Sequence, residues 1–116
     1  MTQKELVART YKSFNKRNIP EAISTLQPDV QWAHGSECGY IYGHEEVATY
    51  WTRQWKLVDP RIEPLRFTLL DNGQLEVKVR QIVKDLKGFL LFDGIALHIY
   101  TFREGLIAKM EIGSTG

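Results

Sequence analysis

The sequence is poor in the features that mark specialised classes of protein. Its 116 residues include a single cysteine, Cys38, so no disulfide can form within the chain. No apolar run approaches the roughly 20 residues of a membrane-spanning helix. The opening residues, MTQKELVART, lack the apolar segment of a signal peptide. These absences predict a cytoplasmic protein with no membrane partner.

The sequence also lacks an excess of charge of either sign. The 15 basic and 14 acidic residues leave a formal net charge of +1. No basic run is interleaved with aromatic residues, so the electrostatic footprint of a nucleic-acid-binding protein is missing. We therefore expect no nucleic-acid partner.

What remains is the composition of an ordinary globular domain. Hydrophobic residues make up 43% of the chain and charged residues 25%, which is typical of such domains. A chain of this length can bury one core, and no repeat or linker divides it. The sequence predicts a single domain over residues 1–116.

Three helices are predicted before residue 60. Thr2-Gln3-Lys4-Glu5 has the spacing of a capping box, and apolar residues recur after it at helical spacing. A second, short helix is predicted from Asn18-Ile19-Pro20-Glu21, and we expect Pro28 to end it. A third helix has one apolar face, made by Val47, Trp51, Trp55 and Val58. We expect Pro60 to end this helix.

Strands fill the rest of the sequence. In PDVQWAH, the side chains of Val30, Trp32 and His34 alternate with their neighbours, which predicts a strand with a buried face that ends in His34. The later turns are Asp71-Asn72-Gly73, Lys87-Gly88 and Glu104-Gly105. They predict an antiparallel meander of four strands. The strand from 89 to 102 is too long to stay flat, and we expect it to bend or bulge at Gly94.

The order of these elements and three segments resemble the NTF2-like superfamily, and within it the SnoaL-like or ketosteroid-isomerase-like branch. The segments are YKSFNKRNIPEAISTLQPDVQW, GHEEVATYW and HIYTFREGLIAKMEI. The resemblance covers nearly the whole chain and implies a cone-shaped α+β fold. In this fold three N-terminal helices pack on the concave face of a strongly bent, mostly antiparallel sheet. The superfamily includes isomerases, cyclases, hydrolases and transport factors, so the fold implies no single activity.

By this resemblance, two histidines occupy the pocket positions that carry the isomerase chemistry. The carboxylate base late in the first strand corresponds to His34, and the protonated acid on the penultimate strand corresponds to His98. The isomerase's tyrosine in the first helix corresponds to Thr10. Because imidazole titrates near neutral pH, we expect His34 to act as a base and His98 as an acid or oxyanion stabiliser, without a cofactor.

The predicted ligand-binding residues are five aromatic side chains, one amide and one methionine, placed on the wall or at the mouth of the pocket. They are Trp32, Tyr42, Trp55, Gln81, Phe92, Tyr100 and Met110. Gln81 interrupts a buried series of valines, so its amide needs a partner in the protein, water or a ligand. Tyr42 lies in a glycine-rich loop that we place over the pocket mouth.

The place of Met110 depends on the turn of the last hairpin. With a three-residue turn, Arg103-Glu104-Gly105, His98 faces the same side as Met110. With the two-residue turn Glu104-Gly105, His98 lies beside Glu111 instead. Glutamate is poorly suited to the positive φ of the shorter turn, so we expect the longer one.

The sequence predicts neither a metal site nor a cysteine nucleophile. The side chains of His34, Glu37, Cys38 and His44 are close in sequence, but their spacing matches no standard metal site. No histidine base lies at a fixed spacing from the cysteine.

The penultimate strand has a second apolar face, turned away from the helices. It is made by Leu91, Ile95, Leu97 and Ile99. Such a face would be exposed in a monomer, so we expect a homodimer that covers it.

The sequence therefore predicts a protein with a pocket for a small apolar molecule, and it leaves the activity open. An enzyme of this kind would move protons on a small apolar or polyketide-like substrate, as an isomerase, cyclase or dehydratase does. A binding module would hold a small apolar ligand with the same residues. A dimeric interaction domain with a collapsed pocket is the third alternative.

Overall fold

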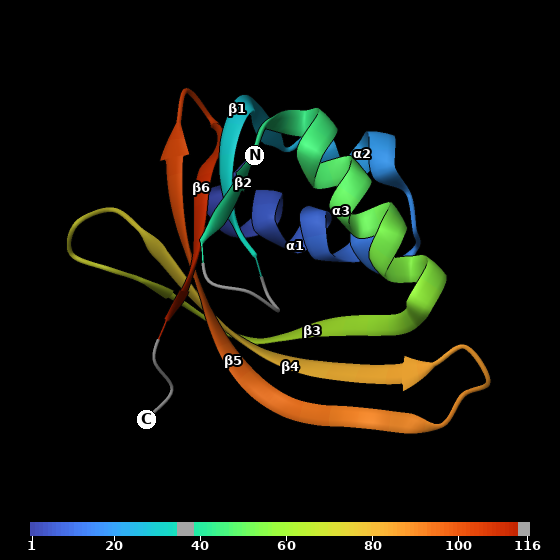
Figure 1. The fold of residues 1–116 in the computed structure, drawn as a ribbon. Helices are drawn as coiled ribbons and strands as arrows, with labels where there is room; N and C mark the ends of the chain where they lie inside the picture. The colour runs from blue at the N-terminus through green and yellow to red at the C-terminus, as the bar shows by residue number, and fades with distance from the viewer. Residues whose placement is uncertain (35–38, 114–116) are drawn as a thin grey trace.

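The computed structural model describes residues 1–34 and 39–113. Three helices and six strands are assigned in these residues. In chain order they are α1 (Gln3–Asn15), α2 (Ile19–Ile23), β1 (Leu26–Ala33), β2 (Tyr40–Tyr42), α3 (Gly43–Leu57), β3 (Val58–Leu69), β4 (Leu75–Asp85), β5 (Leu90–Arg103) and β6 (Leu106–Gly113). The strands form one curved sheet, and the helices cover its concave side (Figure 1).

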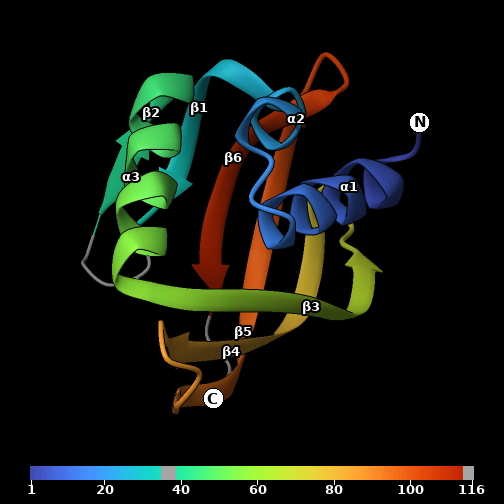
Figure 2. The same ribbon diagram turned by 90° about the vertical axis from the view of Figure 1, so that its right-hand side faces the viewer.

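The sheet has the strand order β2-β1-β6-β5-β4-β3. Strands β3 to β6 form the predicted antiparallel meander, whereas β1 pairs with β6 in parallel. The long strands β4 and β5 curve beneath α1 and α3 (Figure 2). The expected α+β cone, with three helices on a strongly bent and mostly antiparallel sheet, is confirmed.

The helices begin where the sequence predicts. The Thr2 hydroxyl accepts a hydrogen bond from the Glu5 backbone N–H at 3.1 Å, and Asn18 caps α2 by accepting one from the Glu21 N–H at 3.2 Å. The apolar spacing in the sequence predicts a buried face of Val7, Tyr11 and Phe14 with Leu6 and Thr10 beside them. All five are buried in α1, and Ser13 is buried as well.

The predicted helix ends are wrong in two places. The helix α2 ends at Ile23, and Pro28 already lies within β1. The helix α3 ends at Leu57, so that Val58 and Pro60 belong to β3. Because β3 is an edge strand of the sheet, it tolerates a proline that the sequence alone suggests as a helix terminator.

The strand β5 has a bulge, but not at the predicted residue. The register with β4 shifts between the pairs Val83–Phe92 and Lys84–Leu90, so the bulge lies at Leu91 and not at Gly94. At Gly94, which pairs regularly, the Phe92 ring covers the Cα atom. An added Cβ atom there would lie 2.6 Å from Phe92 Cζ.

The last hairpin differs from the prediction in its turn but not in the side that His98 faces. Arg103 pairs with Leu106, so Glu104 and Gly105 alone form the turn, with φ values of 50° and 80°. The register then shifts by one residue, because Phe102 pairs with Ile107 and Thr101 with Lys109. This bulge at Ala108 returns Met110 to the buried side, where it pairs with Tyr100, and it places Ile112 opposite His98.

Candidate functional site

A cavity of about 400 Å³ lies between the helices and the concave face of the sheet. Its walls come from α1, α3 and the inner faces of β1, β3, β4, β5 and β6. Apolar and aromatic side chains dominate them, among them Phe14, Trp32, Trp51, Ile62, Val83, Phe92, Ala96, Met110 and Ile112. A mostly apolar concavity with a few polar groups is the common form of a small-molecule site.

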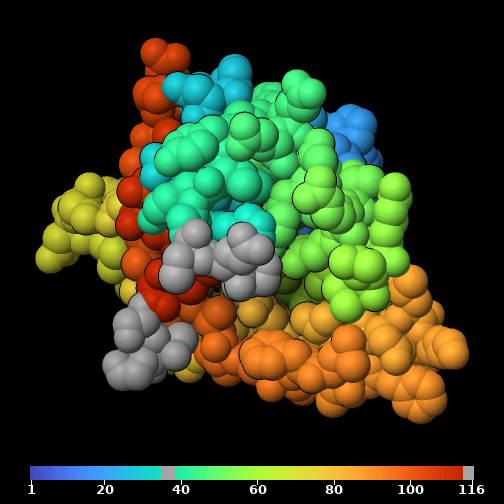
Figure 3. Space-filling view, in the orientation of Figure 1, coloured from blue at the N-terminus to red at the C-terminus, as the bar shows by residue number. Residues whose placement is uncertain are grey.

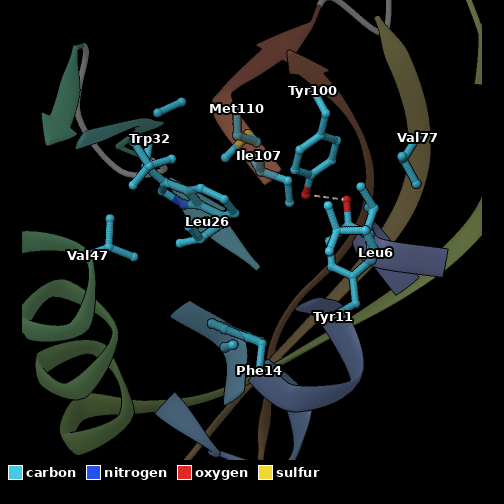
Figure 4. Packing of buried hydrophobic residues seen from close by; sticks show 14 of the residues in the cluster. Leu6, Tyr11, Phe14, Leu26, Trp32, Val47, Val77, Tyr100, Ile107 and Met110 are labelled. Atoms are coloured by element: carbon cyan, nitrogen blue, oxygen red, sulfur yellow. Dashed lines mark hydrogen bonds between the residues drawn. The ribbon is translucent and has the colours of Figure 1, made fainter. Parts of the chain in front are cut away.

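His98 is the central polar residue of this cavity. It lies in the middle of β5 and is 3% exposed. Its Nδ1 atom is 3.0 Å from the hydroxyl oxygen of Tyr11, and the Tyr100 hydroxyl donates a hydrogen bond to the same oxygen at 2.8 Å. Figure 4 shows the two tyrosines meeting in the core.

This chain of hydrogen bonds favours one tautomer of His98. If Nδ1 carried the hydrogen, the Tyr11 oxygen would accept from both His98 and Tyr100, and the hydrogen of the buried Tyr11 hydroxyl would have no acceptor among these three side chains. Donation from Tyr11 to Nδ1 satisfies all three groups, and a neutral His98 then carries its proton on Nε2. Since Nδ1 is occupied and the ring lines the cavity, Nε2–H is the group left to meet a ligand.

His98 stays neutral at physiological pH. Burial lowers its pKa from 6.5 to about 4, because the charged imidazolium loses its hydration. Burial also raises the pKa values of Tyr11 and Tyr100. Among the described residues that line the cavity there is no aspartate or glutamate to stabilise a charged imidazole.

Two glutamines add further polar groups to the wall. Gln81 lies on the inner face of β4, between Ile62 of β3 and Gly94 of β5. Within residues 1–34 and 39–113, its side chain has no hydrogen-bond partner. The Gln54 amide of α3 donates to the Tyr50 hydroxyl at 3.3 Å. The amide of Gln81 is therefore available to a ligand or to water, as the sequence suggested.

The structure places five of the nine predicted site residues on the cavity wall. They are Trp32, Gln81, Phe92, His98 and Met110. Tyr100 is fully buried behind Tyr11, so it reaches the cavity only through that hydroxyl. Trp55 packs against Phe14, with ring centroids 5.3 Å apart, and does not line the cavity.

The two predicted catalytic histidines do not share this cavity. His34 follows β1, and its ring packs on that of Tyr50 with centroids 4.4 Å apart. It borders a separate surface groove together with Tyr42 and His44. Alternation predicted an inward His34, but the strand ends at Ala33, which itself lines the cavity. Tyr50 lines both the cavity and the surface groove.

Tyr11 is the site residue that sequence analysis missed. Its position at helical spacing with Val7 and Phe14 predicted only core packing. The available signal was the choice of tyrosine over phenylalanine, because a buried hydroxyl needs a hydrogen-bond partner. The identity of that partner, 87 residues further along the chain, could not be read from the sequence.

The described residues give no support for a metal site. No three histidine, cysteine, aspartate or glutamate side chains come together there in a way that could hold an ion. Glu37 and Cys38, which the sequence analysis considered, lie outside the described residues. Nor is any helix in the described part of the chain both long and apolar enough to cross a membrane.

Comparisons with known proteins agree with the fold. No family model matches the sequence, and no curated protein is detectably similar to it. Many solved structures are similar to the chain across nearly its whole length. TerC, co-crystallised with polyporic acid, is 23% identical over 95% of this chain and 88% of its own, with a TM-score of 0.82. An NTF2-like protein of unknown function from Burkholderia pseudomallei K96243 is 22% identical over 97% and 91%, with a TM-score of 0.83.

The third structure is more distant in sequence. RV0760c from Mycobacterium tuberculosis, in complex with estradiol-17β-hemisuccinate, is 11% identical over 97% of this chain and 92% of its own, with a TM-score of 0.82. At these identities the likeness establishes the arrangement of the backbone. The chemistry must be argued from the side chains of this chain.

Proposed function

Since the chain has an NTF2-like fold, we propose that it is a SnoaL-like protein that binds one small, mostly apolar molecule with a carbonyl group. The observation that carries the proposal is His98, which lines a mostly apolar cavity and has its Nδ1 atom 3.0 Å from the Tyr11 hydroxyl, so that Nε2–H is left for a ligand. The ligand's carbonyl oxygen accepts from this N–H, and its apolar body packs against Trp32, Phe92 and Met110.

The energetics of burial favour such a ligand. Covering the apolar wall gains roughly 25 cal/mol for each Å² removed from water. A ligand without a hydrogen-bond acceptor would exclude water from the Nε2–H of His98 and leave this group without a partner, at a cost of about 1–3 kcal/mol. The cavity therefore favours a carbonyl compound over a hydrocarbon of the same shape.

Two structural neighbours support this class of ligand. The TerC structure was co-crystallised with polyporic acid, and the RV0760c structure contains estradiol-17β-hemisuccinate. Both molecules are organic compounds with large apolar parts and oxygen substituents.

A matched pair of probes tests the proposal. We suggest measuring the binding of 2-acetylnaphthalene and of 2-ethylnaphthalene, which differ in the carbonyl, by quenching of tryptophan fluorescence. We expect the ketone to bind about fivefold or more tightly than the hydrocarbon, from one net hydrogen bond of about 1 kcal/mol. In the variant His98→Asn, whose amide can still accept from Tyr11, this preference should disappear.

Two results would contradict the proposal. One is that neither probe binds at concentrations that saturate ordinary hydrophobic pockets. The other is that the ketone keeps its advantage in His98→Asn, which would place the hydrogen-bond donor elsewhere. The variant Tyr42→Phe, at a residue outside the cavity, serves as the control and should bind both probes like the parent chain.

A second candidate is a cofactor-independent enzyme that transfers protons on a carbonyl substrate, in the manner of an isomerase or cyclase. The Tyr100–Tyr11–His98 chain supports it, because a fixed, neutral donor can stabilise the enolate formed when a proton leaves the carbon beside the carbonyl. The described cavity offers no carboxylate base, and His34 lies outside it. For this reason we rank binding first.

Exchange of the methyl protons of 2-acetylnaphthalene in D₂O, followed by NMR, separates the two candidates. Exchange that is faster with the parent chain than with His98→Asn would establish proton transfer at this site. Binding without accelerated exchange would leave the protein as a binding module for this ketone.

We also propose that the chain is a single cytoplasmic domain that forms a homodimer through the convex face of β5. Ile95 is 45% exposed, and Leu97 and Ile99 follow it on the same face, partly exposed. Gly113 pairs with Leu97, and a Cβ atom added to it would lie 3.1 Å from Ile99 Cδ1. The resulting apolar stripe is flat enough to be covered by a second copy.

A further inference from the structure

Large apolar side chains are exposed together at one end of the molecule, where α3 ends and the β4–β5 hairpin turns. We call this region the hairpin tip, and its apolar members are Leu57, Leu86, Phe89, Leu90 and Leu91. Each is between 58% and 70% exposed. The pairing of Val58 with Asp85 brings Leu57 next to Leu86. The hairpin projects from the body of the molecule at the lower right of Figures 1 and 3.

The same tip carries an excess of positive charge. Lys56 lies in the last turn of α3, and Lys84 and Lys87 lie on the hairpin. Within residues 1–34 and 39–113, none of the three forms an ion pair. One acid, Asp85, lies in the same turn, where its Oδ1 accepts from the backbone N–H groups of Lys87 and Phe89, each at 2.9 Å, so three lysines stand against one carboxylate.

Other acidic groups near the tip are neutralised by arginines. Asp93 accepts two hydrogen bonds from Arg80, at 2.9 and 2.7 Å, and Asp59 forms an ion pair with Arg17. The tip therefore presents leucines and a phenylalanine flanked by three lysines.

The tip lies close to the wall of the cavity. Phe92 and Val83 face each other across β4 and β5 and both line the cavity, and the next pair along the hairpin is Lys84 and Leu90. The Phe92 side chain is 51% exposed, so the cavity wall reaches the surface of the molecule one residue pair before the tip.

We propose that the hairpin tip docks on an anionic lipid surface. The apolar side chains enter the boundary between headgroups and acyl chains, and the three lysines meet lipid phosphates. Charge selects this occupant over a second copy, because a symmetric contact between two tips would bring six lysines together with only the two Asp85 carboxylates to balance them. The contact could also let the cavity take up an apolar ligand from the lipid. That use rests on the proposed function, whereas the lipid contact itself does not.

This contact goes beyond the expectation that no membrane is a partner. That expectation followed from the lack of a spanning segment, and a surface contact needs none. A surface site needs an apolar group of modest size with basic residues around it, which the fold assembles here from α3 and the β4–β5 hairpin.

Sedimentation with vesicles tests the proposal. We expect the full chain to bind vesicles of phosphatidylcholine and phosphatidylglycerol but not vesicles of phosphatidylcholine alone. The variant Lys84→Gln/Lys87→Gln should bind about 25-fold less tightly, which corresponds to about 1 kcal/mol for each lysine. The variant Leu86→Ser/Phe89→Ser should lose at least tenfold.

The chain provides a matched control at its opposite hairpin. Leu65 and Leu69 of β3 are 51% and 67% exposed but lie away from the tip. The variant Leu65→Ser/Leu69→Ser should therefore bind vesicles like the parent chain. Equal losses in the control and tip variants, or no binding of the parent chain to either vesicle, would overturn the proposal.

Analytical ultracentrifugation of the tip variants in the absence of lipid completes the test. An unchanged mass supports a lipid-facing tip, whereas a dimer that dissociates in Leu86→Ser/Phe89→Ser would identify a second copy as the occupant and overturn the proposal. Binding of 2-acetylnaphthalene, measured without vesicles, reports separately on the proposed function. Failure of the lipid contact and failure of the cavity can thus be told apart.

Discussion

At the scale of the residue, His98 has the chemistry of a neutral donor because of where it is buried. The sequence predicted correctly that it faces the same side as Met110. The sequence could not predict the Tyr11 contact, since the partner lies on a helix 87 residues away. For the same reason it assigned acid and base roles to two histidines that the fold separates, because the end of β1 turns His34 out of the cavity.

The buried His98 predicts a specific dependence of stability on pH. Its pKa is about 4 in the folded chain and about 6.5 when unfolded, so the unfolded chain binds the proton more readily. The stability is therefore complete above pH 6.5 and falls as the pH drops towards 4. At pH 5 we expect a loss of roughly 2 kcal/mol relative to pH 8 from this residue.

Urea unfolding of the parent chain and of His98→Asn at pH 8 and pH 5 measures the contribution of His98 to the pH dependence of stability. The difference in unfolding free energy between pH 8 and pH 5 should be smaller in the variant by that amount. Equal differences in the two proteins would mean that His98 titrates like a solvent-exposed imidazole, and its neutral state in the cavity would have to be abandoned.

At the scale of the element, the prediction for the β5–β6 hairpin was wrong about the turn and correct about the side that Met110 faces. The rule that glutamate avoids positive φ predicted the wrong turn. The inward position of Met110 was nevertheless predicted correctly, because the bulge at Ala108 compensates for the shorter turn. Ile107 and Met110 are both buried, although regular alternation puts residues three apart on opposite faces. The sequence did not indicate the bulge, because Leu106, Ala108 and Met110 alternate there as in a regular strand.

The strained turn predicts a stabilising substitution. Both residues of this turn have positive φ, which is the conformation that Asn-Gly favours in a two-residue hairpin turn. We expect Glu104→Asn to raise the free energy of unfolding by about 0.5–1 kcal/mol, since asparagine adopts this conformation at less cost.

The Lys87-Gly88 turn provides the control for this prediction. Lys87 is not among the described residues with positive φ, so Lys87→Asn should leave the stability nearly unchanged. A destabilised Glu104→Asn protein in chemical denaturation would argue that the longer turn is present in solution.

At the scale of the whole molecule, the resemblance in sequence predicted the cone and its helical cover correctly. The predicted boundaries failed where proline was taken as the end of a helix, because the edge position of β3 in the sheet is a tertiary property. The extent of the exposed apolar surface also depends on the assembled sheet, and it leads to a prediction about assembly.

The proposed dimer predicts that charge on the convex face of β5 produces a monomer. We expect Ile95→Lys/Ile99→Lys to halve the mass measured by analytical ultracentrifugation, because two lysines cannot be buried against a second copy without partners. The circular dichroism spectrum should stay unchanged. A parent chain that is already monomeric at high concentration would refute the dimer, and Leu65→Ser/Leu69→Ser is again the control.

The position of β6 in the sheet has a consequence for how the chain acquires its structure. The strand β6, which follows the other five described strands along the chain, lies between β1 and β5, so without it the sheet consists of two separate parts, β2-β1 and β5-β4-β3. The parallel pairing of Trp32 with Met110 closes a loop of nearly eighty residues, a long-range contact of the kind that slows folding. A nascent chain therefore remains open along β1 and β5, with strand edges that can pair with other chains, until β6 has left the ribosome.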